Sequence, residues 1–277
     1  MSDFPWGTFV GALPLTLLAA VSVLGVTFLV ALRVGRHAVV DVVWGLGFVA
    51  VAWTSFALSA GEGDDVRRLL LVLLTSVWGL RLAWHIWRRS RGKGEDPRYE
   101  ELLSKATGNP SAYAFRRIYL TQALMLWFVS LPVQVGSFET PGPNLLVWLG
   151  VLVWGVGFVF EAVGDHQLHR FRTDPASKGK VLDTGLWRYT RHPNYFGDAC
   201  VWWGLSLIAF SAWPGVLTIV SPVVMTWLLA KGTGKPLLEK GMASSRPDYA
   251  DYVRRTSGFF PLPPRSARTP APTRSDQ

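Results

Sequence analysis

The sequence has little cysteine and little histidine, with one cysteine and five histidines among 277 residues. A single cysteine excludes the intramolecular disulfide framework on which many small secreted domains depend. Cys200 lies in an apolar run, where a small core residue is its ordinary role. No paired histidine boxes occur, and His166 and His169 are the only close pair, so we predict no metal site.

Charged residues are also scarce, at 17% of the chain, and they leave long apolar stretches almost uninterrupted. Apolar runs of about 18 or more residues are typical of transmembrane helices. We therefore predict an all-α, polytopic integral membrane protein with about seven transmembrane helices. The expected spans are residues 9–32, 39–60, 69–87, 118–135, 144–163, 195–210 and 214–230, of which the last two are short.

The formal net charge of +9 would suggest nucleic acid as a partner, but the distribution of the basic residues does not. Lysine and arginine cluster after spans one, three, five and seven, whereas the N-terminus and the segments after spans four and six contain none. Basic loops stay in the cytoplasm, so we predict an exterior N-terminus and a cytoplasmic C-terminus. The expected partners are membrane lipids and a hydrophobic substrate, with no nucleic acid.

No Gly-x-Gly-x-x-Gly fingerprint of a soluble dinucleotide-binding domain is present. Polar chemistry is instead dense between Leu182 and Gly204, in LDTGLWRYTRHPNYFGDACVWWG, which we call the central motif. Pro193 suits the first turn of a helix, which would place Asn194 and Asp198 on one face. Membrane topology explains arginines before a span but not that amide and carboxylate. We expect the motif, with Arg188, Tyr189, Arg191, His192 and Tyr195, to bind a nucleotide at the cytosolic surface.

The helical pattern of the fifth span continues beyond its apolar part. Glu161, Asp165, His169 and Arg172 fall on one face of that helix. This face is either the polar wall of a cavity or a solvated, salt-bridged helix end. Carboxylates and histidine at this spacing can also bind iron or zinc, an alternative that the scarcity of histidine disfavours. Residues 235–264 interleave apolar, aromatic and basic side chains, which suits either an interfacial helix or closure of the cofactor pocket.

The central motif, followed after two spans by DYxxYxxRT and FFP, resembles the C-terminal domain of the steroid 5-alpha-reductase family. That family includes the sterol C14 and C7 reductases, and this chain is most similar to its bacterial branch of uncharacterised proteins. The resemblance covers residues 161–261, whereas the first four spans agree only in pattern. The RHPxYxG element is shared with isoprenylcysteine carboxyl methyltransferases, which bind S-adenosylmethionine.

We predict a single membrane domain over residues 1–261, with four spans in 1–136, and a disordered, Pro-, Ser- and Arg-rich tail in 262–277. The resemblance implies a reductase-like part in 143–261. It implies a bacterial plasma-membrane enzyme whose active site faces the cytoplasm and which uses NADPH to reduce a carbon–carbon double bond of a lipid. The residues implied by it to bind the cofactor are Asp165, Arg172, Arg191, His192, Asn194 and Asp198, to which the polar central motif adds Arg188 and Tyr195. The catalytic glutamate and tyrosine of the family have no clear match, and the nearest candidates are Asp41, His85 and Arg81.

Two alternatives stay open. The first is an S-adenosylmethionine-dependent methyltransferase, although that class usually carries paired glutamates where this chain has Glu239 followed by Lys240. The second is a non-catalytic lipid-binding membrane protein. An intact polar set in the central motif favours an enzyme over that second alternative.

Overall fold

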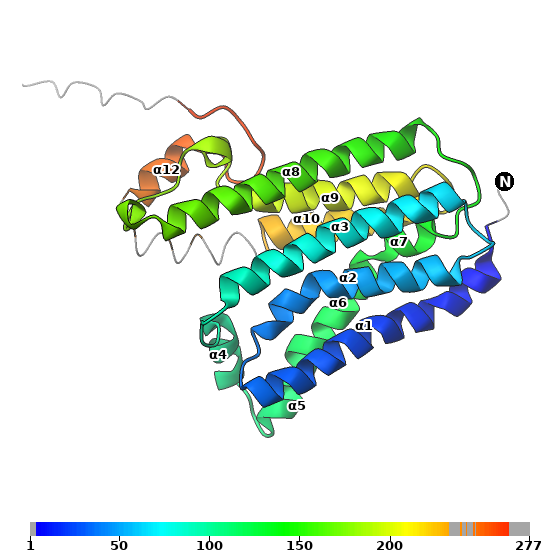
Figure 1. The fold of residues 1–277 in the computed structure, drawn as a ribbon, viewed down its shortest axis with the longest axis horizontal. Coiled ribbons are helices and arrows are strands. Elements are labelled where there is room, and N and C mark those ends of the chain that lie inside the picture. The colour runs from blue at the N-terminus through cyan, green and yellow to red at the C-terminus, as the bar shows by residue number, and fades with distance from the viewer. Residues whose placement is uncertain (1–3, 233–238, 240–241, 243–245, 247, 266–277) are drawn as a thin grey trace, which may run out of the picture. The chain divides into compact units, whose positions relative to one another are not determined.

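The computed structural model describes residues 4–232, 239, 242, 246 and 248–265, and their regular elements are all helices (Figure 1). The predicted all-α class is therefore confirmed for this part of the chain. The chain divides into two compact units. The first unit comprises Met1–Val156 with Cys200–Thr226, and the second comprises Gly157–Ala199 with Trp227–Gln277.

Four helices are long and apolar enough to cross a membrane: α1 (Trp6–Val34), α2 (Val39–Leu58), α3 (Asp65–Ser90) and α8 (Leu145–Thr173). They correspond to the first, second, third and fifth predicted spans. The sixth and seventh predicted spans correspond to α9 (Pro193–Ala209) and to the 3₁₀-helix Gly215–Ile219 followed by α10 (Val220–Ala230). These are shorter apolar elements, so the count of seven stays a prediction.

In the first unit, α2 packs against both α1 and α3 (Figure 1). The approach of α2 to α3 is close enough to require glycine, because a Cβ on Gly45 would lie 2.4 Å from the carbonyl oxygen of Gly79. Nearby, the buried rings of Phe48, Trp78 and Trp202 form a cluster with centroids 4.5–5.5 Å apart. Tight backbone contact and aromatic packing are the main forces that hold these helices together in an apolar solvent.

The stretch predicted as the fourth span does not form one continuous helix. It consists of α5 (Pro110–Ala114), a π-helix at Phe115–Leu120, α6 (Thr121–Val129) and α7 (Leu131–Gly136). The helix breaks at Ser130 because Pro132 lacks the N–H that would continue the hydrogen-bond ladder. Side chains satisfy the carbonyls at the break: Gln134 donates to Trp127 O at 2.8 Å, and Ser221 donates to Val129 O.

One fully buried ion pair joins three connections of the first unit. The Arg67 guanidinium lies 3.5 Å from the Glu139 carboxylate, and both side chains have no exposed surface. Arg67 also donates to the carbonyl oxygen of Glu139 at 3.2 Å and to the hydroxyl of Ser211 at 2.9 Å. The N–H of Asp64 donates to the same carbonyl. The segments around residues 64, 139 and 211 are thereby tied to α3.

The second unit contains the end of α8, the 3₁₀-helices Pro175–Ser177 and Gly185–Arg188, the start of α9, and α12 (Tyr249–Arg255). Helix α8 continues to Thr173, which confirms that the fifth span extends beyond its apolar part. Helix α9 begins at Pro193, as the sequence predicts. Of the predicted disordered tail, residues 266–277 lie outside the described part of the chain.

Candidate functional site

The loop of the central motif is hydrogen-bonded to the C-terminal segment of the second unit. Thr190 and Ser257 form an isolated parallel bridge, in which the N–H of Arg191 donates to Ser257 O at 2.9 Å. The buried hydroxyl of Thr190 donates to Phe259 O at 2.8 Å. Two segments that are more than sixty residues apart therefore fix each other's backbone, and the C-terminal segment is part of the motif's structure.

Glu239 lies at the centre of the motif's charged groups. One of its carboxylate oxygens accepts from Arg191 Nε at 2.9 Å and lies 3.0 Å from His192 Nε2. Burial alone would raise the pKa of Glu239, but the hydrogen bonds from His192 and Arg191 outweigh it and lower the pKa to about 2. Nη1 of Arg191 donates to the carbonyls of Val253 and Thr256. All of these contacts hold the Arg-His pair in a fixed position.

A second polar group lies where α8 meets the start of α9. Asn194 Nδ2 donates to Asp165 Oδ1 at 3.2 Å, and the side chains of Glu161, Asp165 and Asp198 are all buried. The helices come this close because residue 197 is glycine, whose Cβ would lie 2.4 Å from the backbone nitrogen of Glu161. Three carboxyl groups are thus buried where α8 approaches α9, which is costly unless they bind one another or a ligand.

Trp187 links the motif to the helices on either side of it. Its indole N–H donates to Gly164 O in α8 at 3.1 Å, and its own carbonyl accepts from the buried hydroxyl of Tyr252 in α12 at 2.6 Å. The N–H of Leu186 donates to the side chain of Gln167. The 3₁₀-helix that carries Arg188 is therefore anchored on both flanks.

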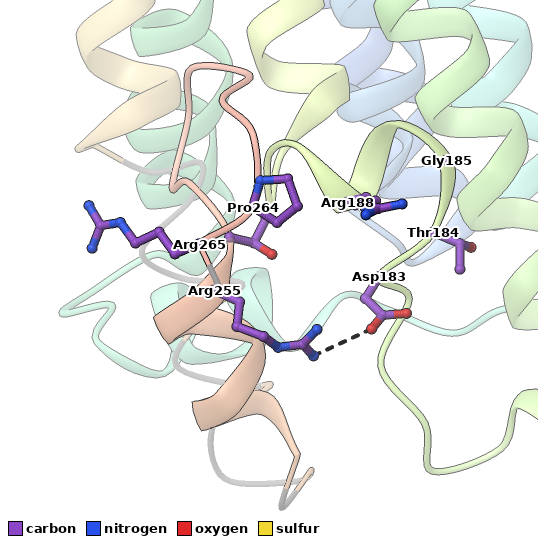
Figure 2. A pocket seen from close by; sticks show the side chains of 8 residues that line it. Asp183, Thr184, Gly185, Arg188, Arg255, Pro264 and Arg265 are labelled. Carbon is purple, nitrogen blue, oxygen red and sulfur yellow. Dashed lines mark hydrogen bonds and ion pairs between the residues drawn. The ribbon is translucent and has the colours of Figure 1, made fainter. Parts of the chain in front are cut away.

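A cavity of about 570 Å³ lies beside this 3₁₀-helix, within the second unit. Figure 2 shows Arg188 and Arg255 at its edges, with Arg255 turned toward Asp183, whereas the side chain of Arg265 extends away. Arg255 forms an ion pair with Asp183 at 3.5 Å. Arg188 is exposed and, among the described residues, forms no ion pair. The cavity is lined by Asp183, Thr184, Gly185, Arg188, Arg255, Thr256, Pro264 and Arg265.

The residues predicted to bind a cofactor all lie in the second unit, in three places. Asp165, Asn194 and Asp198 are at the meeting of α8 and α9; Arg191 and His192 bind Glu239, with the Tyr195 ring stacked on His192 at 5.5 Å; and Arg188 lines the cavity. Arg172 is exposed in the last turn of α8. Their assignment to a cofactor stays a prediction. Glu239 is not among the residues that the sequence predicts to bind a cofactor.

The predicted catalytic residues lie in the first unit. Asp41 accepts hydrogen bonds from the hydroxyl of Tyr99 at 2.5 Å and from Arg98 Nη2 at 2.8 Å. Tyr99 is buried in α4 (Pro97–Ser104), and burial together with Asp41 raises its pKa well above the ordinary value. Arg81 and His85 are half-buried, one turn apart in α3. Tyr99 is a further candidate, which no motif in the sequence indicates.

Comparison with known proteins finds a family and two relatives. A family model described as "Protein of unknown function (DUF1295)" matches residues 27–256. An uncharacterized protein of Schizosaccharomyces pombe is 24% identical over 254 residues, which is 80% of this chain and 72% of the relative. The 3-oxo-5-alpha-steroid 4-dehydrogenase 1 of Mus musculus is 34% identical over 62 residues, which is 22% of this chain and 24% of the mouse protein. No solved structure matches.

Proposed function

The chain belongs to the DUF1295 family, which is steroid 5-alpha-reductase-like, and from this membership we propose that it is a membrane-embedded, NADPH-dependent reductase. The proposed substrate is a hydrophobic molecule with a carbon–carbon double bond conjugated to a carbonyl, such as a steroid or isoprenoid enone. The name of the mouse relative, a 3-oxo-steroid 4-dehydrogenase, supports a substrate of this class.

The observation that carries the proposal is the cavity beside Arg188. Its volume of about 570 Å³ is within the range of small-molecule sites, roughly 300–1,000 Å³. Arg188 brings a guanidinium with no carboxylate partner among the described residues, which suits the 2′-phosphate that distinguishes NADP from NAD. The donor set of this cavity therefore fits a phosphorylated nucleotide.

When bound, NADPH supplies the hydride, and the chain's own residues bind, orient and protonate. Asn194 and Asp165 offer an amide and a carboxylate of the kind that hold ribose hydroxyls. Glu239 fixes the position of Arg191 and His192, and these would orient the motif's backbone toward the cofactor. Their fixed geometry lowers the entropy cost of binding.

Tyr99 is the group we propose to polarise the substrate carbonyl. Its raised pKa keeps the hydroxyl protonated at neutral pH. The hydroxyl has one hydrogen, which it donates to Asp41 here and would donate to the carbonyl oxygen once the substrate is bound. A fixed donor at the carbonyl oxygen stabilises the negative charge that develops there during hydride addition. Asp41 orients the hydroxyl, and Arg98 balances the charge of that carboxylate.

The test is the cofactor selectivity of Arg188→Gln. A charge-assisted hydrogen bond contributes about 1.5–3 kcal/mol, so NADPH affinity should fall roughly 10- to 150-fold while NADH affinity stays unchanged. Arg254→Gln is the matched control, because Arg254 is exposed, lies next to Arg255 and does not line the cavity. If Arg188→Gln binds NADPH as tightly as the wild type, the assignment of this cavity to the 2′-phosphate is wrong.

A methyltransferase is the second candidate, favoured by the contact of Glu239 with the RHP element that both classes share. Against it, Glu239 is the one glutamate in the sequence after residue 231, where that class usually carries a pair. This candidate makes S-adenosylmethionine, not NADPH, the ligand of the motif.

We further propose seven spans with an exterior N-terminus and a cytoplasmic C-terminus, in a bacterial plasma membrane. The absence of lysine and arginine between residues 118 and 169 supports an exterior connection after Ser137. A reporter enzyme fused after Ser137 should be active outside the cell. Activity of that fusion in the cytoplasm would contradict the proposed topology.

A further inference from the structure

Helix α3 has an exposed apolar stripe along one face. Its members recur every three or four residues and are each about half exposed, which is one side of a helix. They are Leu69 (48% exposed), Leu73 (45%), Val77 (49%), Leu80 (54%) and Trp84 (61%). At about 1.5 Å per residue the stripe is roughly 22 Å long, which is most of the thickness of a bilayer's hydrocarbon core.

The stripe ends in aromatic and basic groups. The rings of Trp84 and Trp87 lie 4.9 Å apart, and the guanidinium of Arg91 lies 4.5 Å from the centroid of the Trp87 ring. Arg88 follows Trp84 by four residues and is exposed. In the described part of the chain, neither Arg88 nor Arg91 forms an ion pair.

The cytoplasmic bias of basic residues explains the number of arginines here but not their alignment. Nothing in that bias requires Arg88 to follow the stripe on its helix face, or the Arg91 guanidinium, just beyond the end of α3, to lie over the ring of Trp87. Along the helix an apolar stripe is followed by tryptophans and then by arginines. This order matches the acyl chain, glycerol region and negative headgroup of a single lipid molecule.

We propose that this face of α3 binds an anionic phospholipid, with its phosphate on Arg88 and Arg91. The glycerol region then contacts Trp84 and Trp87, and an acyl chain lies along Leu80 and Val77. The distance fits, because Val77 and Trp87 are ten positions apart, a rise of about 15 Å along a helix, which is the depth of one leaflet. The inference does not depend on the chemistry of the proposed active site.

The test uses the full-length chain, purified in an uncharged detergent and given equal amounts of dioleoyl phosphatidylglycerol and dioleoyl phosphatidylcholine. Native mass spectrometry should show phosphatidylglycerol retained in preference. The variant Arg88→Gln/Arg91→Gln should weaken that retention about 30-fold, at roughly fivefold for each basic residue near a charged surface. The matched control, Arg116→Gln/Arg117→Gln, removes two exposed arginines away from the stripe and should retain the preference.

Three results would overturn the proposal. The first is equal retention of the two lipids by the wild type. The second is an undiminished preference in Arg88→Gln/Arg91→Gln, with melting temperature confirming that the variant is folded. The third is a lipid-free dimer of the chain that Trp84→Ala disrupts, since the stripe would then be an interface between copies of the protein.

Discussion

Replacing Glu239 by glutamine isolates the charge that holds the central motif to its neighbours. The carboxylate accepts from Arg191 Nε at 2.9 Å and lies 3.0 Å from His192 Nε2, with 22% of its side chain exposed. Its pKa of about 2, against an ordinary 4.5, corresponds to about 3 kcal/mol in favour of the ionised form. Glutamine keeps the shape without the charge, so Glu239→Gln should destabilise this region by about that amount.

The assay is hydrogen exchange of residues 186–192 and 249–262 in detergent at neutral pH. A loss of about 3 kcal/mol should accelerate exchange there by roughly 100-fold while leaving α1–α3 unchanged. Asp251→Asn is the control, because its pairs with Arg254 and Arg255 are exposed and contribute about 1 kcal/mol at most.

The contact of Glu239 with Arg191 and His192 should also make the stability of this region depend on pH. The folded pKa of Glu239 is below the unfolded value, so its stabilisation is complete above about 4.5 and is lost as the pH falls toward 2. Protection in the wild type should decline across that window, and Glu239→Gln should show a smaller decline. Equal exchange in wild type and variant, at neutral pH and on acidification, would refute the role given to this carboxylate.

Two further changes test separate parts of the first unit. Arg67→Ala leaves the buried Glu139 carboxylate without its cation, so it should cost about 3–5 kcal/mol in unfolding free energy. Arg67→Met combined with Glu139→Leu should recover most of that loss in thermal melts, and a single variant as stable as the wild type would contradict the pairing. Tyr99→Phe should leave NADPH affinity unchanged but slow reduction of an enone by roughly 10²- to 10⁴-fold, and an undiminished rate would exclude Tyr99 as the acid.

The sequence predicts those features of this fold that depend on neighbouring residues. The extension of α8 to Thr173 and the start of α9 at Pro193 both follow from local periodicity and helix-start chemistry. The interruption at Ser130 was also within reach, because Pro132 is incompatible with an unbroken helix. A count of apolar residues alone predicts one continuous span over residues 118–135, because it takes no account of Pro132.

Contacts between distant segments could not be predicted in the same way. Glu239 is 47 positions from His192, and Tyr99 is 58 from Asp41, so neither spacing carries a helical or strand period. Asp96 and Pro97 predict the start of α4, because aspartate is a favoured N-cap and proline a favoured first residue of a helix. That signal places Tyr99 in a helix, but only tertiary packing brings it to Asp41.

The most direct measurement is the binding of NADPH and of S-adenosylmethionine to the purified full-length chain, side by side, by thermal shift. The proposed reductase predicts a rise in melting temperature with NADPH, a smaller rise with NADH and none with S-adenosylmethionine. A rise with S-adenosylmethionine alone would contradict the reductase and indicate that the central motif is that of a methyltransferase. No rise with any of the three would contradict the enzymatic account and leave a lipid-binding membrane protein.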